Sequence, residues 1–233
     1  MSDARVALVT GAAGAIGGAI VRRLADDGFT VAGVDVAVGA DYRCDVRSEE
    51  EVLRLRDEVE GRHGTPRLLV NVAGAFFEHR ITELSVEDWD LVIDTNLRSQ
   101  FLCCRAALPG MVQRGHGRIV NISSRAWLGG FGQANYSAAK GGVVSLTRSL
   151  AIEFAAKGVT VNAVAPGIVD TPLFRNFEPD VQAKLQASVP VRRIGTADDI
   201  AHAVAFFLDP RSSYVTGQTL YVCGGRSLSS PSV

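Results

Sequence analysis

Six short runs of mainly apolar, β-branched residues recur along the chain, with longer segments of helical pattern between them. Because these runs are almost continuously apolar, we expect each to form a strand that is covered on both faces. Alternating strands and helices with short connections predict right-handed βαβ units. The sequence therefore predicts an α/β fold, a doubly wound parallel sheet of about seven strands with helices on both faces. The expected strands are residues 5–10, 30–36, 67–74, 118–124, 159–167 and 218–223.

Several helix starts carry a hydroxyl side chain followed three positions later by an acid. This spacing is typical of a capping box, in which the two residues satisfy each other's backbone amides. The three pairs are Ser48 with Glu51, Ser85 with Asp88, and Thr196 with Asp199.

The 233 residues are 47% hydrophobic and 21% charged, which is enough for one globular domain with a substantial core. We expect a single domain over residues 1–226 and a flexible tail at 227–233. The 24 basic and 25 acidic residues nearly balance, so we expect no nucleic-acid partner and no anionic lipid surface as partner. A small molecule is the expected ligand.

The cysteines, at positions 44, 103, 104 and 223, show neither CxxC spacing nor a disulfide framework. This usage suits a reducing compartment and predicts buried thiols. The N-terminal residues contain no apolar signal core behind a basic start, and no apolar run reaches membrane-spanning length. We expect a cytoplasmic protein without a membrane partner.

A glycine-rich turn joins the first expected strand to a helix in "VALVTGAAGAIGGAIV". In this context backbone amides and a helix N-terminus can hold a pyrophosphate. Gly11 would permit the tight turn, Gly14 or Ala15 the approach of a cofactor, and Gly17 close packing of the helix on the strand. The competing interpretation, a packing turn only, is weakened by Asp35, whose carboxylate at the end of the second strand can bond ribose hydroxyls.

Asp35 also indicates which dinucleotide is bound. A 2′-phosphate beside this carboxylate would meet like-charge repulsion, and no arginine occupies the turn or directly follows Asp35. The sequence predicts NAD as cofactor, with NADP less favoured. Arg43 is the nearby cation that could reverse this preference.

Tyr136 and Lys140 stand four positions apart in "NYSAAKGG". On a helix this spacing places the ammonium near the phenol. One charge at ~4 Å in an effective dielectric of ~20 supplies about 4 kcal/mol, enough to lower a phenol pKa by roughly 2 to 3 units. We therefore expect a proton-transferring pair. The alternative is two ordinary side chains on one face.

These motifs together resemble the short-chain dehydrogenase/reductase family, and the resemblance covers nearly the whole chain. It implies a Rossmann-type fold and an oxidoreductase acting on CH–OH groups, similar to 3-oxoacyl-[acyl-carrier-protein] reductase-like members. The motifs occur in family order as "TGAAGAIG" (10–17), "NVAG" (71–74), "NISS" (121–124), "YSAAK" (136–140), "APGIVDTP" (165–172) and "VTGQTLYVCGG" (215–225).

The resemblance implies four catalytic positions. Tyr136 would be the general acid and base, Lys140 would also hold the nicotinamide ribose, and Asn96 would order a water on the proton path. A serine would donate a hydrogen bond to the substrate oxygen. The usual spacing of thirteen points to Ser123, whereas alignment on the strand points to Ser124; we choose Ser124 because loops absorb a deletion more easily than strands.

The resemblance also implies a set of cofactor-binding residues. The first group forms the phosphate turn, the second the adenosine side, the third the centre of the sheet, and the fourth surrounds the nicotinamide. They are Gly11, Gly14, Ala15, Ile16 and Gly17; Asp35, Asp45 and Val46; Asn71, Ala73 and Gly74; and Pro166, Gly167, Ile168 and Thr171 with Tyr136 and Lys140.

The chain departs from the family pattern in three places. Ala15 follows Gly14 where a glycine is expected, and Val72 replaces a common asparagine. Only nine residues separate Asp35 from Asp45, too few for the usual intervening strand and full helix. We therefore expect the adenine side to be more open.

Substrate contacts are expected from the loops at 75–80 and 125–132 and from the segment 173–190, which is either a mobile lid or a rigid surface helix. Arg125 could meet an anionic group. No cluster with metal-ligand spacing occurs, so we expect no metal. Aromatic and apolar residues favour an apolar pocket, although core packing is an equal alternative: Phe76, Phe77, Trp127, Leu128 and Phe174.

The expected reaction is hydride transfer between NAD(H) and the carbinol or carbonyl carbon of a small-molecule secondary alcohol or ketone. A 3-oxoacyl thioester and a cyclic hydroxy compound remain open as substrates. The alternative function is a non-catalytic dinucleotide-binding regulator or scaffold. Because the helical segments 103–113 and 141–156 expose apolar area, and the family commonly packs them between subunits, we expect a homotetramer or homodimer.

Overall fold

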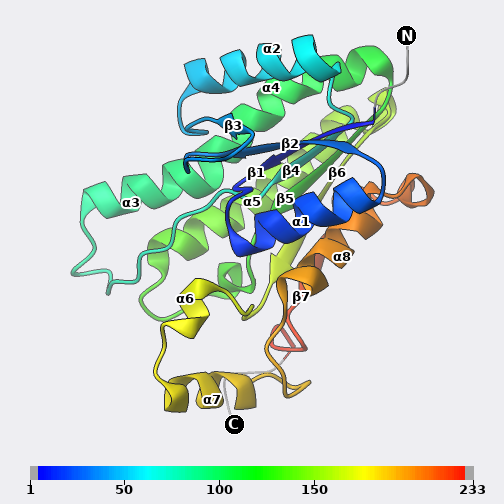
Figure 1. Cartoon of the computed structure of the whole chain (residues 1–233). Helices are drawn as coiled ribbons and strands as arrows, with labels where there is room; N and C mark the ends of the chain where they lie inside the picture. Colours follow the sequence, from blue (N-terminus) through cyan, green and yellow to red (C-terminus); the bar gives the residue numbers. More distant parts are fainter. Residues whose placement is uncertain (1–4, 229–233) are drawn as a thin grey trace.

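The computed structural model describes residues 5–228. Its seven strands form one parallel sheet in the order β3-β2-β1-β4-β5-β6-β7 (Figure 1). The predicted doubly wound α/β fold is thus confirmed. The strands are β1 (Val6–Thr10), β2 (Thr30–Asp35), β3 (Tyr42–Arg43), β4 (Leu68–Asn71), β5 (Gly117–Ile122), β6 (Val159–Pro166) and β7 (Thr219–Val222).

Each of the six expected segments forms a strand, and each strand is shorter than predicted, most of all β4, which ends three residues early. The remaining strand, β3, lies between Asp35 and Asp45, in the stretch that we expected to be too short for a strand. That expectation was wrong for the strand, because two residues are enough to pair with the end of β2. It was right for the helix, since none forms there.

Helices cover both faces of the sheet, with α2, α4 and α5 on one face and α1 and α8 on the other (Figure 1). They are α1 (Ala15–Asp26), α2 (Glu49–His63), α3 (Val86–Ile93), α4 (Ser99–Arg114), α5 (Ala134–Phe154), α6 (Pro172–Arg175), α7 (Pro179–Ala187) and α8 (Ala197–Leu208). A π-helical turn, η1 (Asp94–Arg98), joins α3 to α4, and short 3₁₀ turns occur at η2 (Arg125–Leu128), η3 (Ala155–Lys157) and η4 (Pro210–Ser212).

Successive residues of each central strand enter different hydrophobic cores. In β1, Val6 and Leu8 pack towards α2 and α4, whereas Ala7 and Val9 pack towards α1 and α8. Side chains of a strand alternate between the faces of a sheet, so two covered faces require apolar residues at every position. This is why the strand sequences are continuously apolar.

The strand order reverses between β1 and β4, and ligands bind at such a switch point beyond the carboxyl ends of the strands. Here the end of β4 leaves the sheet. The hydroxyl of Thr10, the last residue of β1, accepts hydrogen bonds from the amides of Val72 (3.0 Å) and Ala73 (3.2 Å). Thr10 is 1% exposed and the two amides are partly buried. These bonds fix where β4 ends.

The predicted caps mark real helix starts, but only one is a reciprocal capping box. Thr196 and Asp199 satisfy each other's backbone amides at the start of α8. Ser48 caps α2, while the Glu51 carboxylate turns to the amide of Asp45 instead. Ser85 caps α3 and donates its hydroxyl to the carboxylate of Asp88.

The segment 173–190 forms two short helices, α6 and α7, at one end of the molecule (Figure 1). No residue of α7 is buried. Within the predicted tail, Ser227 is hydrogen-bonded to the thiol of Cys223. Residues 229–233 of this tail lie outside the described residues. Across residues 5–228, no helix has the length and apolar character needed to cross a membrane.

The junction at Thr10 gives a first prediction. Thr10→Val keeps the shape of the side chain but leaves two partly buried amides without an acceptor, so we expect the free energy of unfolding to fall by about 1–3 kcal/mol. Chemical denaturation measures it. Thr10→Ser, which keeps the hydroxyl, is the control; an equal loss in both variants would show that packing of the methyl group, not the hydrogen bonds, matters.

Candidate active site

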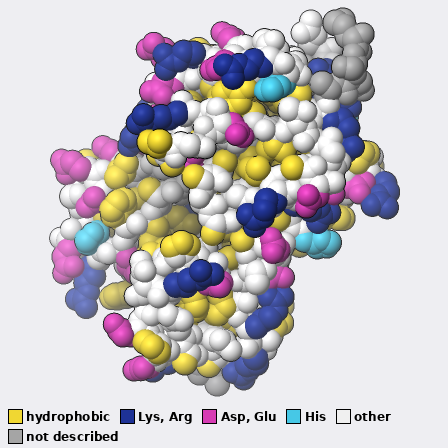
Figure 2. Space-filling view, viewed as in Figure 1, with side chains coloured by type: hydrophobic (Ala, Val, Ile, Leu, Met, Phe, Trp, Pro, Cys, Tyr) yellow, Lys and Arg dark blue, Asp and Glu magenta, His cyan; other side chains and the backbone are white. Residues whose placement is uncertain are grey.

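A cleft of about 460 Å³ opens at the carboxyl ends of β1, β2 and β4. Most of the predicted cofactor-binding residues line it. They are Gly11, Gly14, Ala15, Ile16, Gly17, Asp35, Asp45, Val46, Ala73, Gly74 and Thr171. Figure 2 shows hydrophobic side chains gathered in a hollow on this face, between α3 and α1 and above α6.

The glycine turn is shaped by two close backbone approaches. Gly11 has φ = 66°, and a side-chain carbon there would lie 2.8 Å from the amide nitrogen of Ala73. A side-chain carbon at Gly17 would collide with the carbonyl oxygen of Gly11. Glycine is required at both positions, and the N-terminus of α1 is thereby held against the end of β1.

Two acids mark the far end of the cleft. Asp35 accepts hydrogen bonds from the amides of Ala13 (3.0 Å) and Ala37 (3.1 Å), which orient its carboxylate. Asp45 is bound by the Arg47 guanidinium, with the closest contact at 2.6 Å, and these bonds hold the pKa of Asp45 below its usual value. Arg43, the cation considered in the sequence, does not line the cleft.

Tyr136 and Lys140 lie on the same side of α5, with Nζ 5.5 Å from the centre of the phenol ring. Lys140 is 2% exposed, and Tyr136 is partly buried. The Ser124 hydroxyl makes a hydrogen bond with the Tyr136 phenol. The spacing of four residues therefore places the ammonium beside the phenol, and the Ser124 hydroxyl contacts the same phenol.

The neighbouring serine points elsewhere. Ser123 is 1% exposed and donates its hydroxyl to the backbone carbonyl of Lys140 at 2.8 Å. Adjacent residues at the end of a strand face opposite sides, so only one of the two can meet the phenol. The structure places Ser124, and not Ser123, beside the phenol; Ser124 as the catalytic serine stays a prediction.

Asn96 sits in the π-helical turn η1 and is fully buried. Its amide nitrogen donates to the carbonyls of Ala75 (2.7 Å) and Val92 (2.9 Å), while its Oδ1 has no partner. A side-chain carbon at Gly74 would lie 2.7 Å from this oxygen and 3.7 Å from Lys140 Nζ. Asn96 and Lys140 therefore converge on Gly74, and only glycine leaves room there.

Burial controls the protonation of the pair. It lowers the pKa of the Lys140 ammonium to about 7 and raises the pKa of the Tyr136 phenol, and the hydrogen bond from Ser124 opposes the latter shift. The sequence analysis expected Lys140 to lower the phenol pKa. In the protein alone burial prevails, because Lys140 is itself driven towards its neutral form.

Some expected positions lie outside the cleft lining. Asn71 is buried at the centre of the sheet, where it donates to the side chain of Asn121. Pro166 ends β6, and a side-chain carbon at the following Gly167 would lie 2.7 Å from the Cα of Cys223. Residues that the sequence analysis missed also line the cleft: Val34, Val36, Cys44, Arg47, Val72, Leu91 and Thr95. The last two stand four positions apart, a spacing that places them on one helical face.

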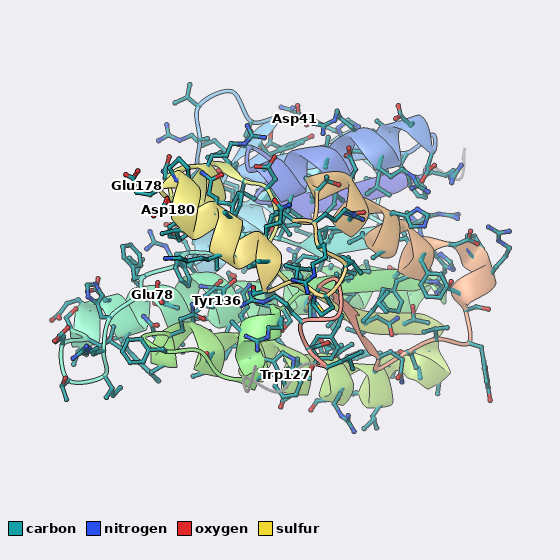
Figure 3. All side chains as sticks on the ribbon, turned by 90° about the horizontal axis from the view of Figure 1, so that it is seen from below. Asp41, Glu78, Trp127, Tyr136, Glu178 and Asp180 are labelled. Carbon is teal, nitrogen blue, oxygen red and sulfur yellow. The ribbon has the colours of Figure 1, made fainter. Side chains whose placement is uncertain are left out.

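On the substrate side, the Phe76 ring meets the Tyr136 ring edge-on, with centroids 5.1 Å apart. Trp127 stacks on Tyr221 of β7, so packing accounts for this residue. Figure 3 looks onto this end of the molecule and shows Tyr136 between Glu78 and Trp127 in the view. Phe77 and Leu128 are partly exposed.

Comparison with known proteins decides the family. The family described as "Enoyl-(Acyl carrier protein) reductase" matches residues 11–227. The chain belongs to the short-chain dehydrogenase/reductase family. Family members bind a nicotinamide dinucleotide, and the chain is an oxidoreductase that acts on alcohol or ketone groups.

Three relatives align over nearly their whole length. The (2S)-[(R)-hydroxy(phenyl)methyl]succinyl-CoA dehydrogenase subunit BbsD of Thauera aromatica is 42% identical, covering 96% of this chain and 97% of the relative. Cis-4-hydroxycyclohexanecarboxylate dehydrogenase of Sinomonas cyclohexanicum is 43% identical, over 95% and 96%. The 3-oxoacyl-[acyl-carrier-protein] reductase FabG of Escherichia coli K12 is 37% identical, over 96% and 97%.

Within residues 5–228, no group of three His, Cys, Asp or Glu side chains is arranged to hold a metal ion. The titratable groups beside Ser124 and Gly74 are the Tyr136 phenol and the Lys140 ammonium. Both can carry a proton between a substrate oxygen and solvent.

The lowered pKa of Lys140 predicts a pH-dependent stability. Between about 7 and its ordinary value of 10.5, the unfolded chain binds a proton that the folded chain has released, so the free energy of unfolding rises with pH. Lys140→Met removes this dependence. We expect the wild type to gain roughly 2–4 kcal/mol relative to the variant across this range.

Denaturation at a series of pH values measures the difference. Lys184→Met, at an exposed lysine of α7, is the matched control and should follow the wild type. If the free energy of unfolding changes with pH in the same way in the wild type and in Lys140→Met, the pKa of Lys140 is not lowered.

Proposed function

We propose that the chain transfers hydride reversibly between NAD(H) and the carbinol or carbonyl carbon of a secondary alcohol or ketone. The observation that carries this proposal is the meeting of Ser124, Tyr136, Lys140 and Asn96 at the edge of a dinucleotide-sized cleft. A nicotinamide held in the cleft would supply the hydride acceptor or donor. The residues supply the proton chemistry and the positioning.

Tyr136 is the general acid and base of this proposal. In oxidation its phenolate takes the hydroxyl proton of the substrate as hydride leaves the carbinol carbon, and in reduction the phenol returns that proton to the carbonyl oxygen. Ser124, already bonded to the phenol, donates to the same substrate oxygen and stabilises its developing charge.

Lys140 and Asn96 connect the phenol to solvent. The ammonium stabilises the phenolate and binds the ribose hydroxyls. Asn96 Oδ1, buried and without a partner, is the acceptor for a water between it and Lys140. A buried oxygen of this kind is unusual unless something donates to it. The proton released by Tyr136 would leave along this path.

The cleft fits a dinucleotide. Gly14, Ala15, Ile16 and Gly17 line it at the N-terminus of α1, where the first backbone amides of a helix stabilise a pyrophosphate. Asp35 would bond the adenosine ribose, and Asp45 with Val46 would flank the adenine. Ala73 and Gly74 would follow the cofactor along β4, with Asn71 supporting them from the sheet. The carboxamide would be surrounded by Pro166, Gly167, Ile168 and Thr171.

NAD is the cofactor that the charges favour. The Asp35 carboxylate lines the cleft, while Arg47 is engaged with Asp45. A 2′-phosphate would therefore face the Asp35 anion. Arg43 pairs with Asp35 in the sheet but does not line the cleft.

The substrate is proposed to be a small, largely apolar molecule. Phe76 packs directly against the phenol, so an apolar wall stands beside the reacting oxygen. The relatives include enzymes named for acyl-thioester and for cyclic hydroxy substrates, and both classes fit this site.

We also propose a homo-oligomer, a tetramer or a dimer, in the cytoplasm. Phe101 on α4 and Ile152 on α5 expose 43% and 84% of their surface, and such residues are covered when these helices pack between subunits. All four cysteines are buried and unpaired, which suits a reducing compartment.

Turnover tests the reaction and separates the two serines. The wild type is assayed by nicotinamide absorbance on acetoacetyl-CoA and on 4-hydroxycyclohexanecarboxylate, and we expect at least one to react. Ser124→Ala should lower kcat by about 10²–10³ and cost about 1 kcal/mol of stability, because its hydroxyl accepts a hydrogen bond from the Ala126 amide. Ser123→Ala should lose stability, about 1 kcal/mol for its buried hydrogen bond, and keep far more of its kcat.

Two results would contradict the proposal. If Ser123→Ala abolishes turnover and Ser124→Ala does not, the assignment of the serine is wrong. If NADH binds but no alcohol, ketone or thioester of a wider panel reacts, hydride transfer is the wrong function.

The preference for NAD depends on one carboxylate. Asp35→Ser removes the like charge from a bound 2′-phosphate, so we expect the ratio of NADPH to NADH dissociation constants to fall by about 10- to 100-fold. Fluorescence titration with both cofactors measures it. Asp41→Asn, which removes a nearby charge outside the cleft, is the control and should leave the ratio near its wild-type value. A wild type that binds NADPH more tightly than NADH would reverse the proposal.

A further inference from the structure

Gln100 is a buried polar residue of α4 that the proposed reaction does not use. It is 1% exposed. Its Nε2 donates to the backbone carbonyl of Ile122 at 3.2 Å, and its Oε1 has no hydrogen-bond partner. A side chain that keeps an unsatisfied buried oxygen destabilises the fold where an apolar residue would not.

The carbonyl of Ile122 is available because β4 ends early. Where β4 and β5 pair, the backbone amide of Arg118 donates to the carbonyl of Arg67, and Asn71 lies opposite Asn121. Continued in this register, the amide of Ala73 would donate to Ile122. That amide is bonded to the Thr10 hydroxyl instead. The last carbonyl of β5 is thus left for side chains.

Two side chains share this carbonyl. Lys140 Nζ donates to it at 2.9 Å, and Gln100 Nε2 donates at 3.2 Å. In the described part of the chain, it is the one acceptor within hydrogen-bonding distance of the Lys140 ammonium. An oxygen that accepts two donors holds each of them less strongly, and the positive end of the glutamine amide repels the ammonium.

We propose that Gln100 is a positioning residue for Lys140: by sharing the Ile122 carbonyl it weakens the hold of β5 on the ammonium, which stays free to reach Tyr136 and a bound ribose. This inference rests on the proposed function for its catalytic consequence. Its effect on the ammonium does not depend on any substrate.

The surroundings of Lys140 make the effect measurable. On its own helix, Tyr136 is the titratable neighbour. The other packed elements present uncharged groups: the Ile122 carbonyl from β5, Gly74 after β4, Asn96 from η1 and Gln100 from α4. Burial alone accounts for the lowered pKa of Lys140, so no nearby charge masks a change at Ile122.

Titration of Lys140 itself tests the proposal. The chain has only three lysines, Lys140, Lys157 and Lys184, so ¹³C-labelled lysine gives three NMR signals, assigned with Lys140→Arg. Gln100→Met keeps the shape and removes the competing donor. The pKa of Lys140 should then rise by about half a unit or more, because the charged form gains the whole carbonyl. The other two lysines report unchanged solvent and pH.

Two further variants keep the result interpretable. Gln100→Glu also removes the donor and adds a carboxylate near the ammonium, so the pKa of Lys140 should rise further than in Gln100→Met. Thr147→Val removes another buried hydrogen bond, from Asn121, farther along α5. It should lower stability and leave the titration of Lys140 unchanged.

An unchanged Lys140 titration in both folded Gln100 variants would overturn the proposal, as would an equal shift in Thr147→Val. If Gln100→Met does not fold, the glutamate variant decides alone. Where turnover is found, Gln100→Met should lower kcat and displace the pH limb of kcat/KM in the same direction as the NMR shift. Lysine shifts as expected with no turnover on any substrate would sink the proposed function and leave this inference standing.

Discussion

The two hydrogen bonds that the Thr10 hydroxyl accepts from the end of β4 determine how the active site is arranged. They turn Val72 and Ala73 out of the sheet at the point where the strand order reverses. The same bonds leave the Ile122 carbonyl without a strand partner, and Lys140 takes its place. A threonine on one strand thus both opens a cleft and creates the acceptor for a buried ammonium.

Burial then sets the electrostatics of the pair at the centre of the site. An ammonium and a phenol that are shielded from water each favour the neutral form. Accordingly, the pKa of Lys140 is lowered and the pKa of Tyr136 is raised. Opposite charges offset this cost only when both groups ionise together. The pair therefore responds strongly to small changes in the hydrogen bonds around it, such as those from Ser124 and at Ile122.

The sequence predicts much of this molecule because the relevant signals are local. Continuous apolar runs gave the six main strands, and the spacing of four gave the contact between Tyr136 and Lys140. The alignment of the serine strand gave the serine that meets the phenol. What it missed depends on contacts between distant segments. Thr10 and Val72 are 62 positions apart, and the Trp127 ring packs on a strand near the other end of the chain, so no local pattern could reveal either contact.

The short connection after β2 has an effect at the rim of the sheet. Its edge strand, β3, is two residues long, whereas typical edge strands present a row of unpaired amides and carbonyls to solvent. With so few unpaired backbone groups, this edge offers another chain little to pair with. The short length of β3 therefore disfavours strand addition at this edge of the sheet, although the strand contains no lysine or proline.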